Sequence, residues 1–393
     1  MKKILMLGGA HSQIPAIKYA KDAGYYVITC DYLPNNPGHE YSDAYYNVST
    51  TDKEGVLALA RKLEIDGIVA YASDPSASSA AYVSEALNLP GASYKSVQIL
   101  AEKDRFRDFL NKNGFNSPKH LSISSIDQLN NFSMSNFPVF VKPVDSSGSK
   151  GITKVERITE LINAFEYAMN YTRCKRVIIE EYIEIPYNQI HGDGFVYKGD
   201  LVFLGLCDHH FKNAAPISST YPSKIIKSQT DRIKKEISRL IQIVGFENGA
   251  INVEVRITEE DKLYIMEIGP RSGGNYVPQL MQCGSGFREV AAIVETAMGN
   301  VPEVIINTEN NFCLQYIIGT DESGIFSKIS FSESLKDKVK MLYLHKNPGE
   351  IITSYKDSSD VLGVLIAKCE DADELEDTIN KIKEHVKVKM KND

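Results

Sequence analysis

Two glutamates lie on neighbouring strand-like segments and could hold a cation between them. Glu254 lies in "NVEVRI" and Glu267 in "YIMEIGPR", and the "TEEDK" segment that separates them fits the turn of a hairpin. Two carboxylates that face each other across paired strands repel unless a cation lies between them. Mg²⁺ is the expected cation, because it binds one or two carboxylates and completes its shell with water and phosphate oxygens. Surface acids on an amphipathic hairpin are the alternative, which the flanking Val, Ile and Met residues disfavour.

Arg271 follows the second of these strands and would place a guanidinium beside the same phosphates or beside a substrate carboxylate. A lysine and a loop of small residues occur earlier, in "FVKPVDSSGSKGITKV", where Lys142 ends an apolar strand. The N–H groups of such a loop can surround phosphate oxygens, although a plain hairpin connection is the alternative. The chain contains no G-x-x-x-x-G-K-S/T sequence. The residues predicted to cover phosphate are Ser146, Ser147, Gly148, Ser149 and Gly151.

The segment "VIIEEYIE" ends an apolar strand with two carboxylates, where unpaired charges are normally avoided. Glu180 and the backbone groups of Glu181 and Ile183 could hydrogen-bond an adenine edge, with Ile183 packing against the ring. An exposed strand end is the alternative.

These residues need strands and helices to position them, and the pattern changes along the chain. Residues 1 to about 115 alternate strand and helix signals, which predicts βαβα units on a parallel sheet. Within "EGVLALARKLE" the apolar residues form one helical stripe of Val56, Leu59, Ala60 and Leu63. From about residue 116 the sequence indicates strands with helices near residues 159–170 and 230–244, an α+β arrangement. We therefore predict an α/β and α+β protein.

The last stretch, from about residue 301, ends in a strand followed by an amphipathic helix. That helix is predicted to carry Leu375, Ile379 and Ile382 on one face. Gly8 and Gly9 end the first strand, where an open α/β sheet often receives a ligand. The full G-x-G-x-x-G pattern is absent, so a dinucleotide site is disfavoured.

Composition excludes several classes of protein. The 393 residues, of which 43% are hydrophobic and 24% charged, suit a soluble protein of two or three domains. A net charge of −7 argues against a broad nucleic-acid-binding face but permits a small basic pocket. Six cysteines without a C-x-x-C pair indicate reduced thiols. The sequence shows no signal peptide and no apolar run long enough to cross a bilayer, so we expect a cytoplasmic protein without a membrane partner.

Taken in order, these motifs resemble the ATP-grasp superfamily, in the branch with biotin carboxylase, carbamoyl-phosphate synthetase and phosphoribosylglycinamide synthetase. The order is "AEKDRF", Lys142, the small-residue loop, "EEYI", the two glutamates and P-R-x-G-G. The resemblance covers nearly the whole chain. It implies a pre-ATP-grasp domain over residues 1–115, an ATP-grasp domain over 116–300 and a C-terminal closing subdomain over 301–393. The small nucleotide lid would lie at about 116–183.

The resemblance also implies roles for individual residues. Lys103 and Lys142 match the two lysines that contact ATP phosphates, although Lys103 alone would suit a solvated helix start. Glu254 and Glu267 match the ligands of Mg²⁺, with Mn²⁺ as an alternative. Arg271 matches the arginine that positions the phosphorylated intermediate, so Arg271 and Lys142 are the predicted catalytic residues. The adenine hinge would be formed by Glu180, Glu181 and Ile183.

Two positions depart from the family pattern. Gln189 stands where relatives commonly have a glutamate that holds the ribose, so the ribose contact could come from Asp193 instead. Gly269 replaces the asparagine of E-x-N-P-R, which leaves water, Asn275 or a substrate group to complete the metal shell. Both carboxylates remain.

The reaction that the resemblance implies begins with attack of a carboxylate on the γ-phosphorus of ATP. An amine, or alternatively a thiol, then displaces phosphate from the acylphosphate, and ADP and phosphate are released. The protein would position the substrates and exclude water, with the loop of residues 146–151 as a lid. Phosphoribosylglycinamide-type, carbamoyl-phosphate-type and amino-acid ligation all stay open.

The predicted contacts to substrate come from separate parts of the chain: Gly9, His11, Asp74, His209, Arg271, Gly273 and Asn275. A metal role for His209 or His210 is disfavoured, because no third ligand has zinc spacing. The expected partners are a small carboxylate and an amine, with a homodimer left open and no nucleic acid. A catalytically weak ATP-binding module is the rival hypothesis. An NAD-dependent dehydrogenase is a further rival, which nothing in the sequence supports.

Overall fold

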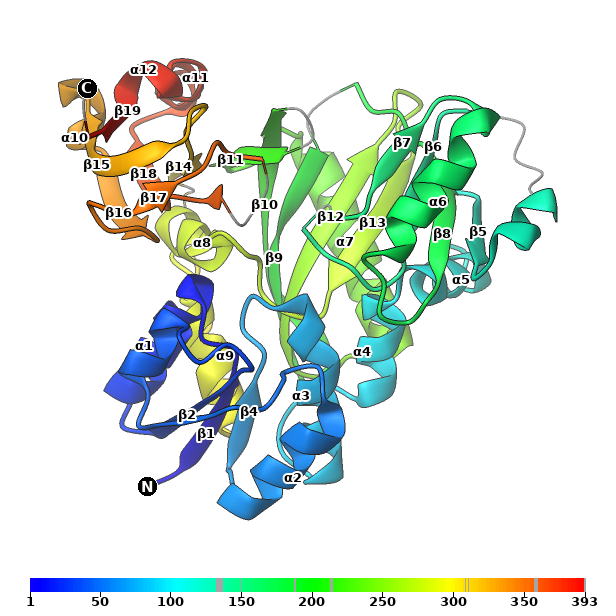
Figure 1. Cartoon of the computed structure of the whole chain (residues 1–393), viewed down its shortest axis with the longest axis horizontal. Helices are drawn as coiled ribbons and strands as arrows, with labels where there is room; N and C mark the ends of the chain where they lie inside the picture. The colour runs from blue at the N-terminus through cyan, green and yellow to red at the C-terminus, as the bar shows by residue number, and fades with distance from the viewer. Residues whose placement is uncertain are drawn as a thin grey trace.

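The computed structural model describes residues 1–131, 137–148, 150–186, 189–212, 215–307, 309, 311–356 and 360–391. Three parts surround a long central sheet (Figure 1). The N-terminal part lies below this sheet in the view, a small sheet built from residues 120–181 lies to its right, and the C-terminal end lies at the upper left. Ser149 of the predicted phosphate loop lies outside the described residues.

The N-terminal part is a parallel sheet covered by helices on both faces. Its elements are β1 (Lys3–Leu7), a 3-10 turn (His11–Gln13), α1 (Ile14–Asp22), β2 (Tyr26–Cys30), a 3-10 turn (Pro37–Tyr41), β3 (Ala44–Tyr46), α2 (Lys53–Leu63), β4 (Gly67–Val69) and α3 (Asp74–Ala86). The strands pair in the order β3-β2-β1-β4 and run parallel, as the sequence predicts.

Successive side chains of β1 point to opposite faces of this sheet. Ile4 and Met6 pack with α1 and with α9 (Glu289–Ala297), whereas Leu5 and Leu7 pack with α2 and α3. Helix α9, although more than 200 residues further along the chain, therefore packs against the N-terminal sheet. The predicted stripe on α2 is buried at Val56, Leu59 and Ala60, and Leu63 is partly buried.

Two helices, α4 (Tyr94–Ala101) and α5 (Lys103–Lys112), lead into the small antiparallel sheet, whose order is β5-β8-β6-β7. Val139 and Val141 point into the core of this sheet, so the alternation places Phe140 and Lys142 on the opposite face. The elements are β5 (His120–Ile123), a 3-10 turn (Ile126–Asn131), β6 (Val139–Pro143), β7 (Thr153–Val155), a 3-10 turn (Ile158–Glu160), α6 (Leu161–Met169) and β8 (Val177–Glu181).

The central sheet is antiparallel throughout and has the order β13-β12-β9-β10-β11-β14-β18-β16. Its strands are β9 (Gln189–Tyr197), β10 (Asp200–Lys212), β11 (Ala215–Tyr221), β12 (Gly249–Ile257), β13 (Leu263–Gly269), β14 (Phe312–Ile318), β16 (Val339–Leu344) and β18 (Gly363–Cys369). Helix α7 (Lys227–Val244) packs against the face that carries Val196 and Val253, and α8 (Val277–Ser285) packs against the face that carries Phe195. The helices expected near residues 159–170 and 230–244 are thus present as α6 and α7.

The C-terminal stretch contributes three strands to the central sheet and also forms a sheet of its own, in the order β17-β15-β19. The remaining elements are β15 (Gly324–Phe331), α10 (Glu333–Lys336), β17 (Ile351–Ile352), α11 (Ala372–Asn380), α12 (Ile382–His385) and β19 (Val386–Met390). The prediction of one helix through Leu375, Ile379 and Ile382 was wrong at its end. The helix ends at Asn380, because the alternating sequence Val386–Met390 forms a strand paired with β15, and Ile382 begins a separate short helix.

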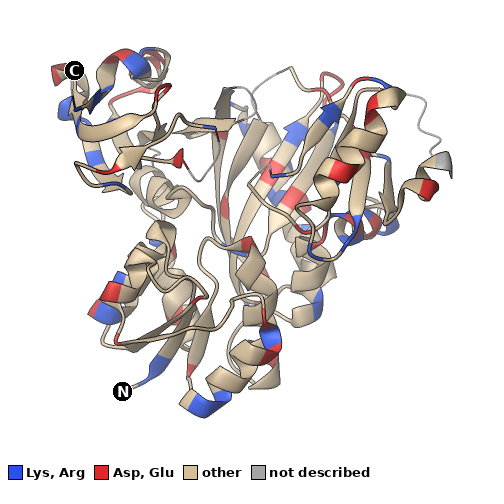
Figure 2. Ribbon diagram, in the orientation of Figure 1, with Lys and Arg blue, Asp and Glu red and all other residues tan. Residues whose placement is uncertain are grey.

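Acidic and basic residues are mixed along the ribbon in all three parts (Figure 2). Each of the six cysteines lies in the described ranges and is a free thiol. Within the described residues, no helix is both long and apolar enough to cross a membrane.

Candidate active site

Two glutamates face each other on the hairpin of β12 and β13, as their spacing predicts. Glu254 and Glu267 are direct cross-strand partners, so their side chains share one face of the sheet. Burial, together with the carboxylate of Glu267, raises the pKa of Glu254 to about 7. The amide Nε2 of Gln189 donates a hydrogen bond to Glu254 Oε2 at 2.7 Å. Lys142, Arg256 and Arg271 offset the negative charge at Glu254 only in part.

Two facing carboxylates suit a divalent cation whose remaining coordination positions are filled by water or by a bound substrate. Among the described residues, no three or more His, Cys, Asp or Glu side chains group as a metal site. Two carboxylates of the protein could hold such a cation, with water and phosphate oxygens completing its shell, which is the usual pattern for Mg²⁺. The two glutamates fit the metal that the sequence predicts.

Gly269 has a local explanation in the packing beside this pair. A Cβ built at Gly269 would lie 3.2 Å from Asp74 Oδ1 and 3.4 Å from Arg271 Cζ. Because the first contact is tight, a larger residue would press on the Asp74 side chain. The ion pair between Asp74 and Arg271 thus occupies the space beside Gly269 that a larger side chain would need.

The ion pair joins distant parts of the chain. Arg271 Nε donates to Asp74 Oδ1 at 2.6 Å, and Arg271 Nη2 donates to Asp74 Oδ2, so the pairing is bidentate. Although burial opposes it, the Arg271 guanidinium holds the pKa of Asp74 below its usual value. The predicted catalytic arginine is therefore fixed by the predicted substrate residue of the N-terminal part.

Asp193 supports the segment after Arg271 and is fully buried. Its Oδ1 and Oδ2 accept the Gly273 N–H at 2.9 Å, and its Oδ1 accepts Asn252 Nδ2 at 2.8 Å. A Cβ at Gly273 would lie 2.9 Å from Asp193 Oδ1, so the glycine permits this close approach. The Asp193 carboxylate is thus engaged by the backbone of this segment and by Asn252, and its contact with a ribose stays a prediction. Asn275 has a φ of 50° and its carbonyl accepts Gln315 Nε2 at 2.9 Å.

Lys142 and Glu180 form an ion pair between neighbouring strands of the small sheet. Arg107 Nε also donates to Glu180 Oε2 at 3.1 Å, and Glu180 is fully buried. Burial opposes ionisation of Glu180, but Arg107 and Lys142 outweigh it and lower its pKa to about 2. The Glu180 carboxylate therefore anchors Lys142 in this state, in addition to lying at the predicted hinge.

Lys103 and the small-residue loop meet as the family order implies. Lys103 begins α5, and its Nζ donates to the Ser146 carbonyl at 2.7 Å. Gly148 and Gly151 have φ values of 67° and 76°, a conformation that favours glycine. Ser146 and Ser147 precede these turns and are partly exposed.

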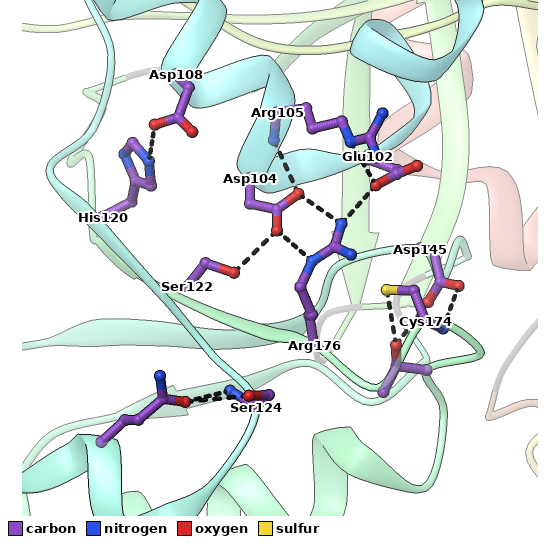
Figure 3. A network of polar contacts seen from close by, with 12 residues as sticks. Glu102, Asp104, Arg105, Asp108, His120, Ser122, Ser124, Asp145, Cys174 and Arg176 are labelled. Atoms are coloured by element: carbon purple, nitrogen blue, oxygen red, sulfur yellow. Dashed lines mark hydrogen bonds and ion pairs between the residues drawn. The ribbon is translucent and has the colours of Figure 1, made fainter.

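A polar network fixes the start of α5 against the small sheet (Figure 3). Arg176, just before β8, pairs with both Glu102 and Asp104, and its Nε lies 2.7 Å from Asp104 Oδ2. Asp145 accepts the Cys174 N–H at 3.0 Å and the Thr172 hydroxyl at 2.8 Å. Lys103 and the loop are thus positioned from both sides.

The hinge region contains one contact that sequence reasoning did not include. Arg256 Nη1 donates to the Ile183 carbonyl at 2.7 Å, and its Nη2 donates to Gln189 Oε1 at 3.1 Å. Glu181 ends β8 and accepts the Lys119 N–H at 3.3 Å. Gln189 is therefore held between Arg256 and Glu254.

A cavity of about 380 Å³ connects several of these groups. Its wall brings Lys103, Ser146 and Ser147 together with Glu267 and Asp74. Three parts of the chain therefore contribute to one chamber: the N-terminal part, the small sheet and the central sheet.

Of the seven predicted substrate residues, Asp74 lines this chamber, whereas Gly9, His11, His209, Arg271, Gly273 and Asn275 are not part of its lining. Gly9 packs under His39, since a Cβ there would lie 2.3 Å from the His39 ring. His11 stacks on His345 with ring centroids 4.4 Å apart, and burial lowers its pKa. His209 stacks on His191 at 4.0 Å, and its buried Nδ1 has no hydrogen-bond partner among the described residues.

Sequence reasoning missed Arg107 and Arg256. Arg256 lies two residues after Glu254 on the same strand, so strand parity alone could have placed it on the same face. Arg107 lies in "KDRFRDFL", where no pattern distinguishes the buried arginine from Arg105.

The fold and the arrangement of these residues agree with an ATP-grasp domain in this chain. Residues 135–279 match the model of the ATP-grasp domain, a range that includes Lys142, both facing glutamates and Arg271. The chain therefore contains an ATP-grasp domain, and the resemblance that its sequence indicates is confirmed.

Particular relatives extend this likeness over different lengths. The chain is 25% identical over 222 residues to the carbamoyl phosphate synthase large chain of Thermoanaerobacter sp., covering 55% of this chain and 20% of the relative. It is 29% identical over 352 residues to formate-dependent phosphoribosylglycinamide formyltransferase of Prochlorococcus marinus, covering 88% of each. The crystal structure of L-amino acid ligase from Bacillus licheniformis superposes with a TM-score of 0.82 at 19% identity, covering 100% of this chain and 99% of that one. The last likeness shows the fold.

Proposed function

We propose that this protein is an ATP-dependent ligase that joins a carboxylate to an amine through an acylphosphate and releases ADP and phosphate. The observation that carries the proposal is the shared chamber, in which Lys103 and Ser146 face Glu267 and Asp74. Lys103 and the Ser146 loop suit the phosphates of a nucleotide. Glu267 and Asp74 would lie beside the group that accepts the phosphoryl.

The chain's own residues would divide the work as follows. Lys103, Lys142 and the loop N–H groups bind the phosphates, and Glu181 and Ile183 supply the adenine hinge. Arg271, fixed by Asp74, orients the substrate carboxylate toward the γ-phosphorus. The loop of residues 146–151 would exclude water while the acylphosphate waits for the amine.

Glu254 and Glu267 would hold Mg²⁺, with Gln189 fixing Glu254 through its hydrogen bond. When bound, the metal neutralises charge on the nucleotide phosphates. The absence of an asparagine at position 269 does not remove either carboxylate, so activity is expected in preference to a catalytically weak module.

Two substrate classes follow from the relatives. The similarity over 88% of a formate-dependent phosphoribosylglycinamide formyltransferase favours a phosphoribosyl amine and a small acid. The likeness to an L-amino acid ligase favours two amino acids. A single panel of substrates distinguishes them.

The test is ADP and phosphate release by purified protein with Mg-ATP. The panel contains pairs of amino acids, formate with phosphoribosylglycinamide, glycine with phosphoribosylamine, and bicarbonate. We expect release that requires one acceptor pair, is lost in Glu267→Ala and persists in Glu259→Ala, which removes an exposed carboxylate from the turn of the same hairpin. Release at an equal rate in wild type and Glu267→Ala for every pair would contradict the proposal.

A further inference from the structure

The chamber's lining includes a lysine, Lys53, that the proposed roles leave unused. The chamber that contains Glu267 and Ser146 extends to Thr51, Lys53, Tyr94 and Gln98, which come from the N-terminal part and α4. Lys53 is the first residue of α2 and is partly buried. A substrate in the chamber could therefore contact this lysine.

Two tyrosines hold Lys53 in place. Its Nζ lies 4.6 Å from the centroid of the Tyr82 ring and 5.2 Å from that of Tyr94, and it donates to the Tyr94 hydroxyl at 3.3 Å. The rings themselves meet edge to face with centroids 5.3 Å apart. Cation–π contact and the hydrogen bond restrict the ammonium to one place, which reduces the ordering cost of binding an anion.

No carboxylate among the described residues forms an ion pair with Lys53 Nζ. The neighbouring Glu54 instead accepts the Tyr82 hydroxyl at 2.8 Å. The hydrogen bond to Tyr94 raises the pKa of Lys53, so its side chain is a cation at neutral pH.

Apart from Glu267, the other charged residues along the chamber already have partners. Asp74 pairs with Arg271, and Glu102 pairs with Arg105 and Arg176. Arg173 donates to the Asp145 carbonyl at 2.7 Å, and Lys103 donates to Ser146. Of the cations that line the chamber, Lys53, Lys103 and Arg173, Lys53 has only tyrosine side chains as partners among the described residues.

We propose that Lys53 and the Tyr94 hydroxyl bind an anionic group, a carboxylate or a phosphate, on one substrate of the ligase. This group would be remote from the reacting group, which would lie near Glu267 and Arg271. The inference rests on the proposed function and narrows its substrate class to molecules with a second oxyanion. Gln98, one turn after Tyr94 on α4, would supply a further hydrogen bond to the same group.

A purely structural role is the competing explanation, in which Lys53 fastens α2 to α4 and binds nothing. The two roles differ in their readouts. A fastening lysine affects the melting temperature alike with every ligand, whereas a binding lysine affects the affinity for anionic ligands only.

The experiment compares matched ligands that differ in one charge: glutamate with glutamine, aspartate with asparagine, and O-phosphoserine with serine. Each is titrated calorimetrically into the full chain with Mg²⁺ and a non-hydrolysable ATP analogue, and each is also assayed for ADP release. The variants are Lys53→Gln, Lys53→Arg and Lys62→Gln, the last removing an exposed lysine of the same helix that does not line the chamber.

We expect one anionic ligand to bind more tightly than its neutral partner. Lys53→Gln should weaken that binding about tenfold to hundredfold, the value of a hydrogen bond to a charged group, while neutral ligands and ATP are unaffected. Lys53→Arg should restore part of the affinity, and Lys62→Gln should match wild type. The phosphoserine pair separates phosphate from carboxylate recognition.

Absence of saturable binding by every anionic ligand, or equal affinities in wild type and Lys53→Gln, would overturn the inference. Failure of the proposed function has a different signature. In that case Lys53-dependent binding persists, but ADP release stays at the same rate in wild type and Glu267→Ala.

Discussion

Oxygen atoms of neighbouring residues fix the three cations of the site. Lys103 donates to the Ser146 carbonyl, Lys142 pairs with Glu180, and Arg271 forms its bidentate pair with Asp74. A cation fixed before its ligand arrives needs little reorganisation when charge develops on a transferring phosphoryl group. Phosphate binding can then exchange one oxygen partner for another without moving the side chain far.

A different residue, Glu289, is expected to make the stability of the protein depend on pH. It is fully buried at the start of α9, and neither carboxylate oxygen has a hydrogen-bond partner among the described residues. Burial, followed by the charge of Asp193, raises the pKa of Glu289 well above its usual value. The folded protein therefore holds this proton more tightly than the unfolded chain does, and its stability should fall as pH rises from about 4.3 toward the folded pKa.

We predict that Glu289→Gln removes this loss of stability with rising pH. The difference in free energy of unfolding between the variant and wild type should grow with pH by up to about 1.4 kcal/mol per pH unit within that window. Urea unfolding between pH 5 and pH 8 measures it. Asp371→Asn, which alters an exposed helix cap far from α9, is the control for a general effect of charge. A variant whose stability runs parallel to wild type at all pH values would contradict the assignment.

At the scale of elements, strand parity made much of the site predictable. The hairpin of β12 and β13 brings Glu254 opposite Glu267, and the alternation in β6 turns Lys142 away from its core, both as the sequence indicates. Contacts between distant segments were not predictable. Arg271 meets Asp74 across 197 positions, and Arg107 reaches Glu180 across 73. Local periodicity contains no information about such pairs, which depend on how the elements pack.

The network around Arg176 couples two elements and gives a second prediction. Arg176→Met should raise the KM for ATP several-fold, because α5, and with it Lys103, loses its tie to the small sheet. The loss of unfolding free energy should be about 1 kcal/mol or less, since the Arg176 side chain is one-third exposed.

Arg105→Met is the matched control, because Arg105 contacts Glu102 but not Asp104 through its side chain. Steady-state kinetics with varied ATP distinguish the two variants. An unchanged KM for ATP in Arg176→Met would show that the network serves stability alone.

On the scale of the whole molecule, the chamber exists only because separate parts converge. The small sheet supplies Ser146, the central sheet supplies Glu267, and the N-terminal part supplies Asp74. Helix α9 leaves the ATP-grasp region and packs on the N-terminal sheet, so these parts are joined by a shared core as well as by the chain. A ligand that contacts all three parts should stabilise the protein as a unit.

The most direct measurement of the central claim is calorimetric titration of a non-hydrolysable ATP analogue, with Mg²⁺ and with EDTA. We predict one binding site whose affinity falls by about tenfold or more when Mg²⁺ is removed or when Glu267 is replaced by Gln. Glu259→Gln should behave as wild type. Equal affinity with and without Mg²⁺, or in wild type and Glu267→Gln, would contradict the assignment of the two facing glutamates as the metal-nucleotide site.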